Sequence, residues 1–385
     1  MNLFTPGPVN ISAAAQSAIG RPRMFHHRSD QFRAMMSKLT SHLKDAFMTG
    51  GEVLTLTSSG TGAMEAAVTG LLSPGNTVLV PVSGKFSRRW AGICEAHGVD
   101  VERIALEPGQ APDAGAIVSA LEADPAICAA LLTHCETSTG SLTDLEANCD
   151  AIHRLEHRSG REILIIADCI TSLYVDELRM DDWGIDCAVA ASQKGLLSPP
   201  GLAFVGLGER ALARLESASS SAYYFDLRKY LSGSPEGVET PFTPAIPLVD
   251  ATLASLEYLA GLGLEPVWQA GRSGAAALRL LAEAAGMKPV ARRQASGVVA
   301  VWTGDLDARQ IARALEREHY IIVAQGQAEL KGRILRFSPI GKSPAMLRGF
   351  ATALTGVLAR LGRTLDMDGI KPEFERLLED CAIWE

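Results

Sequence analysis

Short apolar runs alternate with longer amphipathic segments along the first two thirds of the chain. Each run has the length of a strand, and several lead into a segment whose apolar residues recur at helical spacing. The expected strands are 53–57, 77–82, 101–106, 128–133, 163–167, 187–192 and 202–207. The expected helices are 62–72, 86–97, 113–123 and 144–159. This alternation predicts a mostly parallel sheet that is covered by helices on both faces.

The pattern changes near residue 252, where helical segments replace the alternation. The expected elements are helices at 252–261 and 266–285, strand-like pieces at 297–302, 320–324 and 334–338, and a helix at 344–361. The Ala- and Leu-rich second segment is a good helix former and needs no further role. We therefore expect an α/β fold with a large domain, residues 1–255, and a smaller C-terminal α+β domain, residues 256–385.

Composition narrows the possible partners. The chain has 385 residues, 47% of them hydrophobic, and a net charge of −8. This charge argues against a nucleic-acid partner, which calls for a basic face. No apolar stretch approaches the roughly 18 residues of a membrane span, and the N-terminus lacks a signal-peptide pattern. The seven cysteines include no Cys-x-x-Cys pair, which fits a reducing compartment. We expect a cytoplasmic protein without a membrane or nucleic-acid partner.

Two charged residues directly follow apolar runs. Asp168 follows the run 163–167, and Lys194 stands just after 187–192 in Ser192-Gln193-Lys194-Gly195. In a parallel sheet, ligands bind beyond the carboxyl ends of the strands. Each residue alone is more often a solvated loop residue or a helix cap. Together they are what a pyridoxal phosphate (PLP) enzyme needs: a lysine to form a Schiff base and an aspartate to keep the pyridine nitrogen protonated.

A small-residue loop, Ser58-Ser59-Gly60-Thr61-Gly62, connects an expected strand to an expected helix. Such a loop lets an anion approach the backbone, and the helix N-terminus offers unpaired N–H groups and a favourable dipole. Alone, it is more often an ordinary strand–helix turn. It is neither a Walker A motif nor a Gly-x-Gly-x-x-Gly loop, so it suggests a phosphate without specifying a nucleotide.

The chain resembles the class-V, fold-type I PLP-dependent aminotransferases of the alanine–glyoxylate, serine–glyoxylate and serine–pyruvate group. The most specific match is Ser192-Gln193-Lys194-Gly195 with its upstream aspartate. The other matching segments, in family order, are Thr5-Pro6-Gly7-Pro8-Val9, Ser59-Gly60-Thr61-Gly62-Ala63-Met64-Glu65, Thr133-His134-Cys135-Glu136-Thr137-Ser138-Thr139-Gly140, Pro199-Pro200-Gly201, Thr243-Pro244-Ala245 and Arg336-Phe337-Ser338. The resemblance implies a fold-type I transferase that binds PLP and works as a homodimer with shared active sites.

The resemblance also implies roles for individual residues. The implied phosphate contacts are Ser59, Gly60, Thr61, Gln193 and, from the neighbouring subunit, Thr243. Phe86 would stack on the cofactor ring, where relatives often carry a larger tryptophan. Thr137 would bond the phenolic oxygen of the cofactor, and Lys194 would act as the general base.

Substrate binding is implied at the end of the chain's last expected strand. Arg336 would bind a carboxylate through its planar fork, and Gly7 would bring backbone close to the same group. The expected reaction moves an amino group from an alanine- or serine-type donor to glyoxylate or pyruvate by a ping-pong mechanism.

Other functions stay open on the sequence alone. One is transamination of an aminophosphonate. Another is a lyase or cysteine desulfurase of the same fold, which would need a cysteine on a mobile loop, whereas Cys381 lies near the chain end. A third is a non-catalytic binding subunit. The His26-His27-Arg28 segment suggests a metal, but adjacent histidines are expected to point apart and no cluster at ligand spacing supports them, so we expect no metal site.

Overall fold

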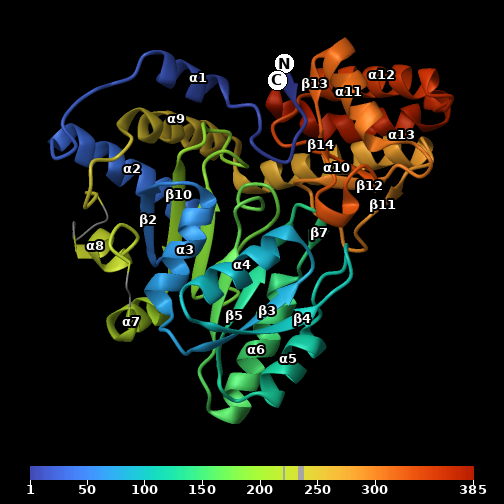
Figure 1. Cartoon of the computed structure of the whole chain (residues 1–385). Helices are drawn as coiled ribbons and strands as arrows, with labels where there is room; N and C mark the ends of the chain where they lie inside the picture. The colour runs from blue at the N-terminus through green and yellow to red at the C-terminus, as the bar shows by residue number, and fades with distance from the viewer. Residues whose placement is uncertain (220–221, 233–237) are drawn as a thin grey trace.

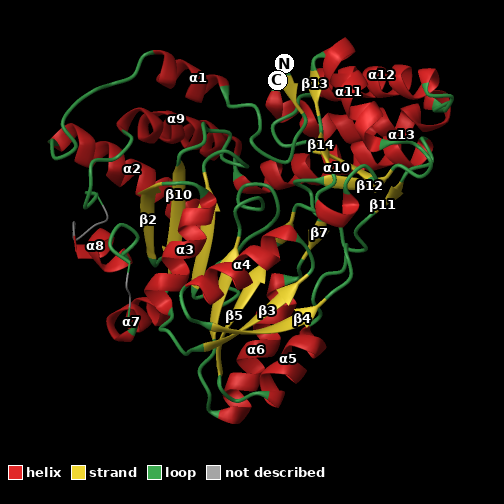
Figure 2. Cartoon of the chain, viewed as in Figure 1, coloured by secondary structure: helices red, strands yellow, loops and turns green. Residues whose placement is uncertain are grey.

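The centre of the molecule is a seven-stranded sheet (Figures 1 and 2). The computed structural model describes residues 1–219, 222–232 and 238–385. The strand order is β2-β10-β9-β8-β5-β3-β4. The bounds are β2 Glu52–Thr57, β3 Thr77–Val82, β4 Asp100–Ala105, β5 Ile127–Thr133, β8 Leu164–Asp168, β9 Cys187–Ala191 and β10 Leu202–Leu207. Only β10 runs antiparallel to its neighbours in this sheet. The expected α/β fold with a mostly parallel sheet is confirmed.

Helices cover both faces of this sheet because successive strand residues point to opposite sides. Ile165 packs into one buried cluster and its neighbour Ile166 into the other. The first cluster lies under α2 Asp30–Phe47, α5 Ala114–Ala123, α6 Leu145–Ser159 and α9 Ile246–Leu262. The second lies under α3 Gly60–Leu71, α4 Lys85–Ala96, α7 Glu209–Ser217 and α8 Leu227–Ser232. A further helix, α1 Ala13–Gly20, packs on α9.

The C-terminal part is a second, smaller α+β unit (Figure 2). Its antiparallel sheet has the order β11-β12-β15-β14. The strands are β11 Lys288–Pro289, β12 Val299–Trp302, β14 Ala324–Gln325 and β15 Ile334–Phe337. The helices are α10 Leu264–Ala284, α11 Ala308–His319, α12 Pro344–Arg360 and α13 Met367–Glu379, with short 3-10 turns at Ala328–Leu330 and Asp380–Trp384.

The chain's first residues pack against this C-terminal unit. Strand β1 Asn2–Leu3 pairs in parallel with β13 Ile321–Ile322, and the ring of Phe4 stacks on Phe350. The expected division into two domains at residue 255 falls inside α9 and stays a proposal.

The remaining strands, β6 Cys135–Glu136 and β7 Ser141–Leu142, form a small hairpin beside the main sheet. Among the described residues, no helix is long and apolar enough to cross a membrane.

Candidate active site

Lys194 and Asp168 meet at one edge of the main sheet. Asp168 is the last residue of β8, and Lys194 lies just beyond the end of β9. These two strands are parallel neighbours, with Asp168 opposite Val189, so both side chains come from the carboxyl ends of adjacent strands. Lys194 is 9% exposed and Asp168 is 5% exposed. The Nζ atom of Lys194 donates a hydrogen bond to the carbonyl oxygen of Pro6 over 2.6 Å.

Burial moves both groups towards neutrality, because a low-dielectric site disfavours charge. It lowers the pKa of the Lys194 amine to about 8, although Cys135 and Asp168 oppose this shift. It raises the pKa of the Asp168 carboxyl to about 6, although the N–H of Ile170, which donates to Oδ1 over 2.9 Å, opposes this shift. Such shifts at a strand edge are typical of groups that handle protons.

The small-residue loop begins α3 next to Asp168. Ser59 precedes the helix, and Gly60 is its first residue. A Cβ atom on Gly60 would lie 2.6 Å from Cδ1 of Ile170, so a larger residue would require the Ile170 side chain to move where the helix N-terminus approaches the segment after β8. Thr61 follows in the first turn, and its hydroxyl accepts a hydrogen bond from Nη1 of Arg89 over 2.9 Å.

A buried glutamate that the sequence interpretation missed holds one wall of the site. Glu136 is 1% exposed and accepts hydrogen bonds from the backbone N–H groups of Phe86 and Ser87, at 3.0 and 2.9 Å. Its other oxygen accepts from the N–H and hydroxyl of Ser138. The carboxylate thus joins the start of α4, where Phe86 lies, to the loop that carries Thr137.

Arg336 reaches this wall from the smaller sheet. It is on β15 and 5% exposed. Its Nη1 atom donates to the carbonyl oxygen of Thr137 over 2.7 Å, and its Nη2 atom donates to that of Gln325 over 2.7 Å. Burial lowers the pKa of its guanidinium to about 10, while Glu136 opposes the shift. The fork is therefore held in place by backbone on both sides, from two different parts of the fold.

Gly7 covers Lys194 from the N-terminal segment. A Cβ atom there would lie 2.1 Å from Nζ of Lys194, and the residue has a φ of +140°. Both the close approach and the backbone conformation require glycine. The structure therefore brings Gly7, Lys194, Asp168 and the α3 loop into one region.

Comparisons with known proteins identify the family of this chain. The class-V aminotransferase family matches residues 11–338, a span that contains Asp168, Lys194 and Arg336. The chain belongs to the class-V aminotransferase family. The L-aspartate–glyoxylate aminotransferase of Paracoccus denitrificans is 33% identical over 374 residues, 95% of this chain and 93% of the relative. A solved aspartate aminotransferase of subgroup IV from Thermus thermophilus has a TM-score of 0.86 and 38% identity, and the match covers 94% of this chain and 99% of that chain.

A third relative carries a different name. It is the soluble hydrogenase small subunit of a Synechococcus species, 35% identical over 368 residues, with 94% of each chain covered. Among the described residues, no group of three or more His, Cys, Asp or Glu side chains lies close enough to hold a metal ion.

Two further residues expected in a class-V aminotransferase site are Gln193, which has a buried side-chain oxygen, and Thr243, which is exposed. Gln193 stands directly before Lys194, and its Oε1 atom is buried without a hydrogen-bond partner among the described residues. Thr243 is exposed and lies just before α9. The roles of both side chains remain predictions.

One expectation about His26 and His27 was wrong. Their rings do not point apart but stack, with centroids 4.6 Å apart, because the loop before α2 is not extended at this point. Arg28 beside them forms an ion pair with Glu239 over 3.0 Å.

Cys381 was the cysteine considered for a desulfurase reaction. It is 1% exposed, and its thiol donates to the carbonyl oxygen of Ala270, so it is not on an open loop.

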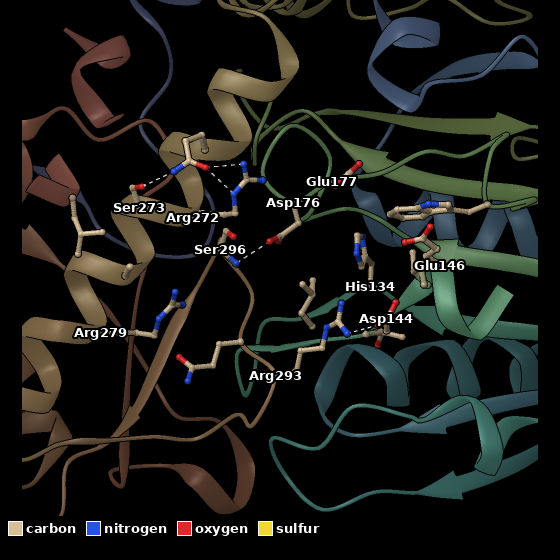
Figure 3. A pocket seen from close by; sticks show the side chains of 18 residues that line it. His134, Asp144, Glu146, Asp176, Glu177, Arg272, Ser273, Arg279, Arg293 and Ser296 are labelled. Atoms are coloured by element: carbon tan, nitrogen blue, oxygen red, sulfur yellow. Dashed lines mark hydrogen bonds and ion pairs between the residues drawn. The ribbon is translucent and has the colours of Figure 1, made fainter. Parts of the chain in front are cut away.

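A separate cavity of ≈ 650 Å³ lies between α10 and the segment around β7 and α6 (Figure 3). Arg279 and Arg293 enter it from the C-terminal side, and His134 from the main sheet. Asp176 accepts a hydrogen bond from the N–H of Ser296 across it, over 2.9 Å. Neither Lys194 nor Asp168 lines this cavity, so we do not place the aminotransferase reaction there.

Proposed function

We propose that the protein is a PLP-dependent aminotransferase that moves an amino group from a small amino acid to a small keto or aldehyde acid, with glyoxylate or pyruvate as acceptor. The observation that carries this proposal is the buried pair of Lys194 and Asp168 at the carboxyl ends of two adjacent parallel strands. The names of the Paracoccus and Thermus relatives add aspartate to the alanine- and serine-type donors to be tested.

The residues present fit the cofactor. The start of α3 and the hydroxyl of Thr61 offer a place for a phosphate, and the unpartnered Oε1 atom of Gln193 is close in sequence to the lysine. Asp168, held in a low-dielectric position, is suited to face a positively charged ring nitrogen. Bound PLP would supply the electron sink for loss of the donor's Cα proton.

The chain's own groups would then do the following work. Lys194 would move the Cα proton, because an amine with a pKa of about 8 is partly neutral near physiological pH. The carbonyl of Pro6 would keep the Nζ atom in place. Arg336 would bind the carboxylate shared by donor and acceptor, exchanging a backbone carbonyl contact for it.

We further propose a cytoplasmic homodimer in which Thr243 reaches the neighbouring subunit's cofactor. The exposure of Thr243 supports its contact with a neighbouring subunit. The seven cysteines are all free thiols in the structure, which supports a cytoplasmic location.

A donor–acceptor screen tests the activity. PLP-loaded protein is mixed with alanine, serine, aspartate or 2-aminoethylphosphonate, and the visible spectrum is followed as the cofactor takes the amino group. Glyoxylate or pyruvate is then added, and the new amino acid is quantified by chromatography. At least one carboxylate donor should convert the cofactor completely without an acceptor, as a ping-pong mechanism requires. If only the phosphonate reacts, the aminophosphonate alternative replaces this proposal.

A further inference from the structure

Arg89 lies on the face of α4 that borders the candidate site. It is three residues after Phe86, and residues at this spacing share one helix face. Its guanidinium carbon is 4.8 Å from the centroid of the Phe86 ring, and its Nη1 atom donates to the hydroxyl of Thr61 over 2.9 Å. Glu136 holds the first turn of α4 through two backbone N–H groups, so the position of Arg89 is set by the same wall as that of Phe86.

The neighbouring Arg88 points elsewhere. It is exposed and forms an ion pair with Glu329 over 3.5 Å. Arg89 is only partly exposed, and no carboxylate in the described ranges 1–219, 222–232 and 238–385 forms an ion pair with it. Arg88 thus has a carboxylate partner at the surface, whereas Arg89 has no ion-pair partner among the described residues.

Without an anion, the positive charge of Arg89 is balanced in part by the buried carboxyl of Asp168, whose pKa Arg89 helps to lower. The N-terminus of α3 carries a positive partial charge, and Thr61 lies in its first turn. A guanidinium bonded there adds a second positive charge to the first. The charge of Arg89 also acts on the candidate site. Burial is the main cause of the lowered pKa of the Lys194 amine, and Arg89 is among the charged groups that lower it further. An anion at the start of α3 would balance both positive charges.

We propose that Arg89 binds the phosphate group of the cofactor, together with the loop Ser59-Gly60-Thr61. The proposal rests on the proposed use of PLP. A planar guanidinium can donate two parallel hydrogen bonds to a phosphate. Arg89 would therefore contribute affinity to PLP but not to pyridoxal, which has the same ring and aldehyde without the phosphate.

The test compares the two ligands without measuring turnover. Protein freed of cofactor is titrated with PLP and with pyridoxal, and binding is followed by visible absorbance and protein fluorescence. In Arg89→Gln the Kd for PLP should rise at least about tenfold, while that for pyridoxal changes by less than about twofold. Arg88→Gln is the matched control, because it removes the same charge one residue away, and it should leave both Kd values unchanged.

A second readout does not depend on PLP. Inorganic phosphate should raise the Tm of the cofactor-free wild-type protein and of Arg88→Gln more than that of Arg89→Gln. The Tm of each protein without any anion is the baseline from which its response to phosphate is measured. If Arg89→Gln does not fold, Arg89→Lys serves instead. It keeps the charge but loses the fork, so its Kd for PLP should lie above that of the wild type.

Three outcomes would overturn the assignment. In one, PLP and pyridoxal lose affinity equally, which would mean that Arg89 supports the ring or the fold. In another, PLP binding is unchanged but amino-acid affinity falls, which would place Arg89 at the substrate carboxylate. In the third, inorganic phosphate stabilises Arg89→Gln as much as the wild type. If wild-type protein binds neither PLP nor pyridoxal, the proposed function fails, and the phosphate comparison still decides the role of Arg89.

Discussion

For single residues, burial rather than direct pairing sets the chemistry of the site. Lys194 bonds to a neutral carbonyl and not to a carboxylate. Asp168 receives a backbone N–H and not a cation. Each group is consequently left with a pKa shifted towards the neutral range, and for Lys194 this suits proton transfer near neutral pH.

Lys194→Ala should abolish the aldimine absorbance band that appears when the wild-type protein is loaded with PLP, because Lys194 is the lysine that follows β9. The fold should persist, since the change removes a buried charge. Absorbance and far-ultraviolet circular dichroism check both statements. Borohydride reduction followed by peptide mass spectrometry provides the control: a reduced adduct on another lysine would contradict the assignment.

Asp168→Asn should separate stability from activity. A carboxyl whose pKa is about 6 in the folded state and 3.8 when unfolded favours folding while it is protonated, and this contribution is lost as the pH rises through 6. Above that pH, the cofactor-free Asn variant should be more stable than the wild type by about 3 kcal/mol. The difference should fade near pH 4. Urea unfolding at the two pH values measures it.

The same variant should transfer amino groups several powers of ten more slowly, because no carboxylate would face the ring nitrogen. Single-turnover spectra with a saturating donor measure this rate. Near-normal turnover would mean that another group balances the positive charge of the ring nitrogen. Equal stability of the two proteins at high pH would mean that Asp168 is better solvated than its burial indicates.

At the scale of elements, the sequence predicted most of what local patterns encode. Strands β3 and β10 lie where their apolar runs predicted, and β4 begins one residue earlier than expected. Helix α9 begins at Ile246 rather than 252, because Pro247 stands in the first turn, where proline is tolerated. Helices α1, α2, α7, α8, α11 and α13 were not predicted. In α2 and α11 the buried residues do recur at helical spacing, so this signal was present in the sequence and was overlooked.

Contacts between distant elements were harder to predict. The pairing of β1 with β13 joins residues at opposite ends of the chain, and no local pattern signals it. Glu136 was missed because its partners, the N–H groups of Phe86 and Ser87, are backbone groups from another element. Lys194 and Asp168 were found because strand ends in a parallel sheet converge, a rule that needs only strand positions.

Arg336→Lys tests the connection between β15 and the wall of the site. A lysine keeps the charge but lacks the planar fork, so it cannot hold a backbone carbonyl and also bind a carboxylate through two parallel hydrogen bonds. The apparent affinity for donor and for acceptor should both fall, by about 2–5 kcal/mol if the lost pairing is fully desolvated. Half-reaction titrations measure each affinity. PLP binding is the control and should not change; loss in only one half-reaction would show that the carboxylate site is not shared.

At the scale of the whole molecule, the proposed sharing of active sites can be tested by mixing inactive parents. Thr243→Asp would place a negative charge against the neighbouring cofactor's phosphate, and Lys194→Ala removes the reactive amine. A dimer of one subunit of each kind has one complete site, built from the Lys194 of one chain and the Thr243 of the other. Random reassociation should restore about a quarter of the wild-type activity. A mixture no more active than its parents would rule out the shared site.

The N-terminal segment has a further consequence for anyone who alters this end of the chain. Residues 2–8 begin in the C-terminal unit, through β1 and Phe4, and end over Lys194, through Pro6 and Gly7. This segment covers the amine and shields it from water. Deleting residues 2–4 should detach the segment from the C-terminal unit and expose Lys194 to solvent. The pKa of Lys194 should then return towards its ordinary value and the pH profile of amino transfer should move upward, although no residue of the main sheet has changed.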